Sequence, residues 1–257
     1  MAKKNKELNT EEKNTETFGE KFSRKEDAIR RKYWYRCNRV TAYLIDLLIV
    51  LVLTTLLAES SITNPYKSNT QSSYEEFKTV YNIEVQKREN KNLNKKELES
   101  MIESIAKPYR IYTIRRNFAS YLWYLVILFF YLGFFQFYNN GQSIGKKFYK
   151  LKVVDKNDKK ASLKQMLLRN IFGGNTLIFG NNVVIFLSLL TMVFVKNPVH
   201  FVYIYTVVTG LGFIMDAIFI ILFLFKKNAR SLDDLVGGTK VIETTMKKDL
   251  KWFIIML

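Results

Sequence analysis

The sequence is poor in the residues that build metal centres and covalent cross-links. Its 257 residues include one cysteine, one histidine and three prolines. The single cysteine, Cys37, excludes an internal disulfide, and one histidine argues against a histidine–cysteine metal site. Residues 1–35 contain no long apolar segment, so they do not resemble a cleavable signal peptide. Because this stretch is polar, we expect a disordered cytoplasmic tail. No cofactor or metal is expected.

The charge is unevenly distributed along the chain. Lysine and arginine total 40 against 23 aspartate and glutamate residues, a net charge of +17. Such an excess is typical of nucleic-acid-binding proteins, but here the charges cluster in blocks between nearly uncharged apolar runs. Membrane proteins acquire the same excess from basic cytoplasmic loops that face anionic lipids. We therefore expect the lipid bilayer as the partner, with anionic headgroups at the cytoplasmic face, and no nucleic acid.

Four apolar runs have the character of membrane spans. A helix needs roughly 20 apolar residues to cross about 30 Å of hydrocarbon. Three runs reach this length, whereas the run at 183–195 does so only if it begins near residue 176. A short third run is alternatively a re-entrant segment or half-helix. A buried soluble core is disfavoured, because soluble helices are rarely apolar all round. The sequence predicts an all-α membrane protein with about four transmembrane helices, at about 40–58, 118–138, 176–195 and 201–225.

Basic residues set the expected orientation. They precede the first run, fill the connection from 146 to 164, and follow the last run. The positive-inside rule then places both termini in the cytoplasm of a multi-pass cell-membrane protein. Residues 59–117 form an exterior insertion of about 60 residues, where the charge rule loses force. We expect two short polar helices, a small cap or a disordered loop there. Richness in lysine, asparagine and isoleucine indicates an AT-rich bacterial genome.

The stretch YNNGQSIGKKFYKLKVV, at 138–154, resembles a phosphate-binding loop in composition only. A Walker loop has four residues between its first glycine and the glycine–lysine pair, and it lies between a strand and a helix. Here three residues separate Gly141 from Gly145, and a predicted span precedes them. The spacing and the context both argue against nucleotide binding.

The same stretch instead predicts a small cytoplasmic strand. Its apolar residues alternate with lysines at the period of a strand, in the order Tyr149, Lys150, Leu151, Lys152 and Val153. A turn and a helix over 161–172 are expected to follow. Gly141 and Gly145 would let the chain leave the bilayer tightly. Lys146 and Lys147 are expected to reach lipid headgroups.

Four segments in this order resemble the RDD membrane-protein family. They are RVTAYLID at 39–46, GQSIGKKFYKLKVV at 141–154, LLRN at 167–170 and RSLDDLVGGTKVI at 230–242. The resemblance implies a membrane domain over 36–242, followed by a cytoplasmic tail over 243–257 with an apolar end. It also implies transport of ions or small solutes, the activity usually suggested for a poorly characterised family. The exterior insertion is longer than is usual in that family.

The resemblance also implies which residues carry the family motif. Arg39 takes the place of the family's arginine and Asp46 that of its first aspartate. Asp234 matches the second aspartate, although Asp233 stands where the family usually has a histidine, so either of the two fits that role. The full set of implied motif residues is Arg39, Asp46, Asp233, Asp234, Gly141, Gly145, Lys146, Arg169, Gly238 and Thr239.

Two aspartates lie inside the predicted spans. Asp46 is about 9 Å and Asp216 about 14 Å from the cytoplasmic ends of their helices. A central aspartate costs on the order of 2.5–3.5 kcal/mol to insert, so both are expected to face the bundle interior. They either relay protons or sodium ions, or hold the helices together through polar partners. Arg39 shares a helical stripe with Asp46 and is expected to contact Asp233 or Asp234.

The leading functional interpretation is transport of a small ion or solute, with protons or sodium as candidate coupling ions. A homo-oligomer is expected because four helices enclose little volume. The alternative is a non-transporting membrane scaffold, or an assembly or regulatory factor. No enzyme is expected, since the sequence contains no recognisable nucleophile–base pair.

Overall fold

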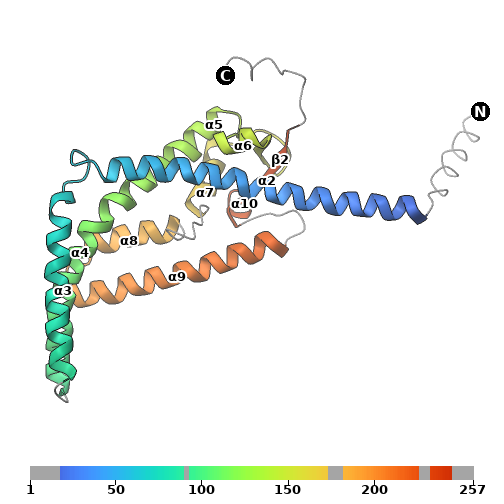
Figure 1. The fold of residues 1–257 in the computed structure, drawn as a ribbon. Helices are drawn as coiled ribbons and strands as arrows, with labels where there is room; N and C mark the ends of the chain where they lie inside the picture. The colour runs from blue at the N-terminus through green and yellow to red at the C-terminus, as the bar shows by residue number, and fades with distance from the viewer. Residues whose placement is uncertain (1–17, 90–92, 173–181, 226–231, 245–257) are drawn as a thin grey trace, which may run out of the picture.

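The computed structural model describes residues 18–89, 93–172, 182–225 and 232–244 of the chain. These residues are almost entirely helical, with one two-stranded sheet (Figure 1). The expected mostly helical architecture is confirmed. The tail expected to be disordered differs in part, because a helix begins at Phe18 and continues into the first apolar run. A helix propagates more easily than it nucleates, so a stable span can extend into a polar flank.

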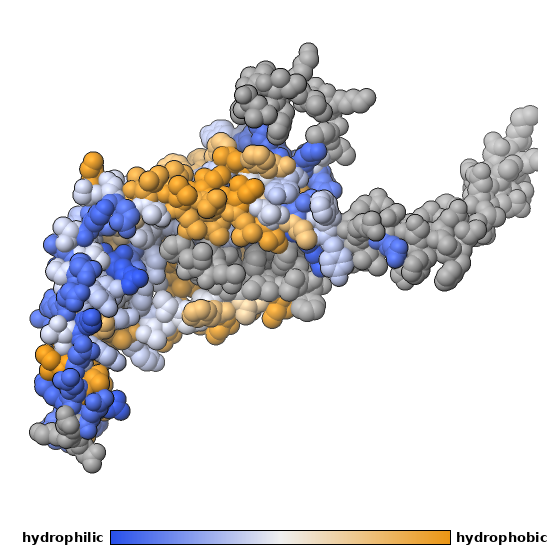
Figure 2. Space-filling view, viewed as in Figure 1, coloured by the Kyte–Doolittle hydropathy of each residue, from blue (hydrophilic) through white to orange (hydrophobic). Residues whose placement is uncertain are grey.

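The first long helix, α2 (Phe18–Ala58), has two opposite faces. Its stretch Tyr33–Ala58 is long and apolar enough to cross a membrane. The buried face recurs at helical spacing through Arg39, Ala42, Asp46, Val50 and Thr54. The exposed face carries a stripe of apolar side chains, Val40, Leu44, Leu48, Val52 and Leu56. Figure 2 shows this apolar surface over the middle of α2. Such a face is suited to lipid.

Residues 59–117 form a helical hairpin that continues into the second span. The two helices, α3 (Lys67–Glu89) and α4 (Lys95–Leu128), lie side by side in Figure 1. Asn94 caps α4 in a reciprocal capping box with Glu97. Aromatic rings join the two helices, with Phe77 stacked on Tyr112 at 6.0 Å between centroids. The helical interpretation of the insertion is therefore confirmed.

The second span is longer than the sequence indicates. Helix α4 passes into a π-helix, η2 (Phe129–Phe135), and a final short turn, α5 (Gln136–Tyr138). Together they form a 44-residue candidate span, Lys95–Tyr138. The second helix of the hairpin and the predicted span at 118–138 are thus one continuous element. No glycine or proline near residue 117 separates them.

The count of four spans is not confirmed. Within the described ranges, three helices are long and apolar enough to cross a membrane, the third being Pro198–Met215 in α9 (Pro198–Phe225). Helix α8 (Asn182–Phe194) has 13 residues and measures about 20 Å. The start of the predicted span at 176–195 lies outside the described residues. Phe201 and Tyr205 of α9 pack against Leu189 and Met192 of α8.

A small unit lies at the end of the bundle from which α2 extends toward the N-terminus (Figure 1). It contains α6 (Ile144–Phe148), β1 (Leu151–Asp155), α7 (Leu163–Phe172), α10 (Leu232–Val236) and β2 (Thr239–Glu243). The strands pair antiparallel, with Leu151 opposite Glu243 and Asp155 opposite Thr239. The predicted strand and the predicted helix at 161–172 are both confirmed. Strand β2 was not predicted. A core of Ala42, Leu151, Val153, Ala161, Met166 and Val241 joins this unit to α2.

Candidate functional site

Four buried charged side chains meet where α2, α7 and α10 come together. We call Arg39, Arg169, Asp233 and Asp234 the arginine–aspartate cluster. Arg39 donates to Asp234 at 2.7 Å, and Arg169 donates to the other oxygen of Asp234 at 2.6 Å. Arg169 also pairs with Asp233 at 2.8 Å. The contact predicted between Arg39 and the two aspartates is thus confirmed. Asp234 occupies the central position, because it accepts from Arg39 on one oxygen and from Arg169 on the other.

The cluster is electrically balanced. Two guanidinium groups face two carboxylates, and the side chain of Asp234 is fully enclosed, at 0% exposure. Buried charges are tolerated when they are paired and hydrogen-bonded. Arg169 makes one further bond, to the Thr239 hydroxyl at 3.3 Å. Gly238 permits the turn from α10 into β2 with φ of 61°, which brings Thr239 next to Arg169. The motif residues Arg169, Gly238 and Thr239 therefore belong to one site.

Asp46 forms a second polar site, farther along the same face of α2. Its side chain accepts hydrogen bonds from the Tyr131 hydroxyl at 2.7 Å and from the Gly145 backbone N–H at 2.8 Å. The Ser143 hydroxyl donates to its other oxygen, and the Lys146 ammonium lies 3.3 Å from that oxygen. We call these five residues the Asp46 site. Donors from Tyr131, Ser143, Gly145 and Lys146 therefore converge on the Asp46 carboxyl group.

Local backbone geometry explains why these donors converge. The π-helix η2 carries Tyr131, and π-helical turns are frequent at functional sites. Ser143 caps α6 by accepting from the Lys146 N–H. Gly145 touches α2 closely, since a Cβ there would lie 2.1 Å from the Ala42 carbonyl oxygen. Gly141 has φ of 85° and lies against Val153. The glycines of GQSIGKK therefore serve packing within the protein.

Lys146 does not reach lipid headgroups as the sequence predicted. Its side chain is 13% exposed and lies between Asp46 and the Ser143 hydroxyl, 3.1 Å from the latter. Burial lowers the pKa of the Lys146 ammonium, while the charge of Asp46 opposes that shift. The prediction was wrong because adjacent lysines on a short helix point in different directions, and Lys146 is the one that faces α2. The neighbouring Lys147 is exposed.

The second relay candidate, Asp216, is not brought to this site by the described contacts. Its backbone lies in α9, and its side chain lies outside the described part of the structure. Among the buried side-chain atoms without a hydrogen-bond partner in the described residues are Thr54 Oγ1, Asn170 Nδ2 and Asn182 Oδ1. Asn182 donates to the Asn170 backbone oxygen at 2.6 Å, so two of these atoms belong to residues in direct contact.

Sequence reasoning missed Ser143, Tyr131, Asn170 and Asn182. Ser143 stands between the two glycines of the motif, which was a usable signal. No sequence pattern indicated a role for Tyr131, because the π-helix that carries it cannot be recognised from hydrophobic periodicity. In the described residues, no group of three or more histidine, cysteine, aspartate or glutamate side chains is placed to hold a metal ion.

Gly145→Ala tests the close approach of α6 to α2. We expect a large loss of thermal stability, because the added Cβ would collide with the Ala42 backbone, which cannot move independently. Overpacking of this kind costs about 1–3 kcal/mol, occasionally more. Gly210→Ala is the matched control, since nothing lies within 4 Å of the position that its Cβ would take. Equal unfolding temperatures for the two variants in detergent would contradict the contact.

The sequence of the chain matches a known protein family. The RDD family model matches residues 36–238, which include Asp46, Lys146 and all four members of the arginine–aspartate cluster. No curated protein and no solved structure matches the chain. Since the matched residues cover most of the sequence, the chain belongs to the RDD family.

Proposed function

We propose that this membrane protein moves a small ion or solute across the bilayer, and that the arginine–aspartate cluster is a gate that opens during transport. The observation that carries the proposal is the burial of four mutually neutralising charges at the junction of three separate elements. Side-chain ion pairs link α10 to α2 and to α7 at this point. Separation of α2 from α10 would break the Arg39–Asp234 pair and leave the backbone hydrogen bonds within each helix intact.

A purely structural role explains the cluster less well. Removing charges from water costs several kcal/mol per ion, and apolar side chains of similar volume often stabilise a fold at least as much. A network of paired charges has a different advantage, because it defines one closed arrangement and can be opened by a competing ion. Arg39 also lies within the candidate span Tyr33–Ala58, and ionisable residues inside membrane spans are functional by default.

The unpartnered polar atoms supply a second, independent support. Asn170 and Asn182 are buried next to one another, and each has an unsatisfied atom. The Asn170 side chain also lies against η2, 3.7 Å from the position of a Cβ built on Gly133. A buried polar spot of this kind binds water when it offers enough partners. We propose it as a position through which a hydrated ion or small polar solute passes.

Asp46 has a conditional role in this proposal. Donors from η2 and from the Ser143–Lys146 segment fill both of its oxygens. It can exchange a proton or bind sodium only if α6 moves away from α2. Asp216 remains the second relay candidate. We further propose that the protein lies in the cell membrane with both termini in the cytoplasm and that it forms a homo-oligomer.

Ion flux in liposomes tests the proposal. We expect the purified protein to carry at least one of H⁺, Na⁺, K⁺ or a small anion above the leak of empty vesicles. Asp46→Asn and Asp216→Asn keep the shape of the side chain and one of its two acceptor oxygens but remove the titratable charge, so each should reduce coupled flux at equal protein content. Wild-type flux in both variants would exclude a relay role for Asp46 and Asp216. The absence of any flux from the wild-type protein would contradict the transport proposal and favour the non-transporting alternative.

A membrane scaffold or assembly factor is the second candidate. The observation in its favour is the α3–α4 hairpin, which exposes Tyr81, Ile83, Leu98 and Ile102. Figure 2 shows the hairpin with a largely polar surface interrupted by apolar side chains. Charged replacements at Ile83 and Ile102 distinguish the two functions, because they should impair partner assembly in a scaffold and leave flux unchanged in a transporter.

A further inference from the structure

The short segment from Ser143 to Lys150 has two chemically different sides. The inner side binds Asp46 and packs against the small apolar core, through Ser143, Gly145, Lys146 and Tyr149. The outer side is exposed and combines apolar with basic side chains, namely Ile144, Lys147, Phe148 and Lys150. Phe148 is 65% exposed. An aromatic side chain exposed to this extent gains free energy when an apolar environment replaces the water around it.

The backbone keeps these outer residues together. Ile144 and Phe148 are four residues apart in α6, which places them on one face. The Lys150 N–H donates to the Lys147 carbonyl at 3.2 Å, so the chain turns and brings the two lysines into the same turn. The outer side thus presents an apolar pair bordered by two ammonium groups.

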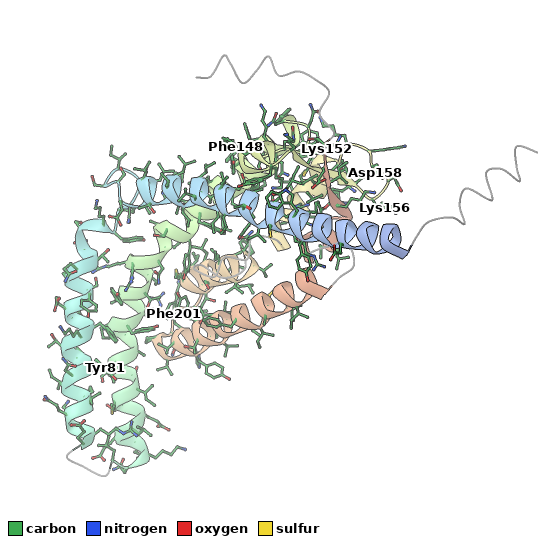
Figure 3. The ribbon with its side chains drawn as sticks, turned by 45° about the vertical axis from the view of Figure 1, so that its right-hand side comes forward. Tyr81, Phe148, Lys152, Lys156, Asp158 and Phe201 are labelled. Carbon is green, nitrogen blue, oxygen red and sulfur yellow. The ribbon has the colours of Figure 1, made fainter. Side chains whose placement is uncertain are left out.

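This outer side continues the apolar surface of α2. Gly145 packs directly on Ala42, so α6 lies beside the span. Figure 2 shows apolar surface running from the middle of α2 onto the α5–α6 region. Figure 3 shows Phe148 at the outer margin of the small unit. Tyr138, at the end of the second candidate span, is 73% exposed. Aromatic side chains at a span's end typically mark the membrane–water interface.

We propose that α6 is an interfacial anchor that binds anionic lipid headgroups. Ile144 and Phe148 insert at the boundary between acyl chains and headgroups, and Lys147 and Lys150 contact the lipid phosphates. Short amphipathic segments bind membranes by this combination of apolar burial and attraction to anionic lipids. The inner side of the same segment supplies three of the groups that bind Asp46. Lipid binding therefore stabilises the Asp46 site from outside, whatever the protein transports.

Lipid quenching tests the position of Phe148. In a Cys37→Ser background, Phe148→Cys is labelled with an environment-sensitive fluorophore, and the protein is placed in liposomes that contain lipid spin-labelled near the carbonyl. We expect strong quenching and a blue-shifted emission. Tyr81→Cys on the α3–α4 hairpin is the control and should show little of either. Quenching of the Phe148 label no greater than that control would mean that protein or water covers this side, and would overturn the proposal.

Thermal unfolding in nanodiscs tests the charge preference. We expect the wild-type protein to unfold at a higher temperature in phosphatidylglycerol than in phosphatidylcholine. Lys147→Gln with Lys150→Gln should remove more than half of this difference. Lys156→Gln with Lys159→Gln, at exposed positions in the turn after β1, should preserve it. Equal losses in the two double variants would overturn the proposal, and so would the same stabilisation by inorganic phosphate in phosphatidylcholine discs. Neither experiment depends on transport activity.

Discussion

Replacing Asp234 with alanine should lower the free energy of unfolding by about 3–5 kcal/mol, the typical cost of breaking a buried ion pair by removing one partner. Asp234 accepts from Arg39 on one oxygen and from Arg169 on the other, at 2.7 and 2.6 Å. Without it, two buried guanidinium groups remain with only Asp233 between them. Chemical unfolding in detergent, followed by the change in helical circular dichroism, measures the effect.

Asp233→Ala is the matched control for that experiment. Asp233 pairs with Arg169 and its side chain is 11% exposed, so its removal should cost clearly less than removal of Asp234. Arg39→Ala combined with Asp234→Ala should destabilise less than the sum of the two single changes, because both remove the same contact. Strict additivity would show that the Arg39–Asp234 pair contributes nothing.

Asp46→Ala should be similarly destabilising, by about 3–5 kcal/mol. The change leaves the Lys146 ammonium buried without its counter-charge and leaves the Gly145 N–H without an acceptor. Asp46→Asn should cost less, because an amide oxygen can replace one of the two carboxylate oxygens. Adding Lys146→Met to Asp46→Asn should recover part of the loss, since no unpaired charge then remains. Thermal unfolding at equal detergent concentration measures all three variants.

The informative result is whether Lys146→Met restores thermal stability to the Asp46→Asn protein. If Lys146→Met instead destabilises the Asp46→Asn protein further, the lysine has another partner that matters more than Asp46. The same variants separate stability from function, because Asp46→Asn is also the flux variant. A protein that unfolds normally but has lost coupled flux would assign Asp46 a role beyond packing.

The predictable parts of this fold are those with a local signal. The buried face of α2 follows from helical periodicity, and it places Arg39 and Asp46 on one stripe. The contact of Arg39 with Asp234 also follows from sequence, because a buried arginine near the end of a span needs an acidic partner at the same level. Strand β1 and helix α7 were predictable from the alternation and amphipathic spacing of their own residues.

The remaining parts depend on contacts between distant segments. Strand β2 is a five-residue segment whose partner is β1, and no local pattern shows which short strand it joins. Which of the two lysines, Lys146 or Lys147, faces the protein interior likewise depends on a contact between distant segments. Gly145 allows α6 to approach α2, and this approach decides which lysine turns inward. The span predicted at 176–195 stays a prediction at its N-terminal end, because apolar composition alone does not show where a helix begins.

The two polar sites lie on one helix, which gives the proposed mechanism its geometry. Arg39 and Asp46 are about 10 Å apart along α2. Side chains of α10 and α7 form the cluster around Arg39, while η2 and the Ser143–Lys146 segment supply the donors to Asp46. Movement of the small unit away from α2 would therefore open both sites. In the proposed mechanism, a gate at Arg39 and a relay at Asp46 would therefore open together.

The distance between α2 and α10 during flux tests this account most directly. Cys37 is exposed on α2, two residues before Arg39, and Leu235 is exposed on α10. Spin labels at Cys37 and at Leu235→Cys report their separation by pulsed electron resonance in liposomes. Under an ion gradient that drives flux, we predict a second, longer distance that is absent without the gradient. One unchanged distance during active flux would contradict a gate at the arginine–aspartate cluster.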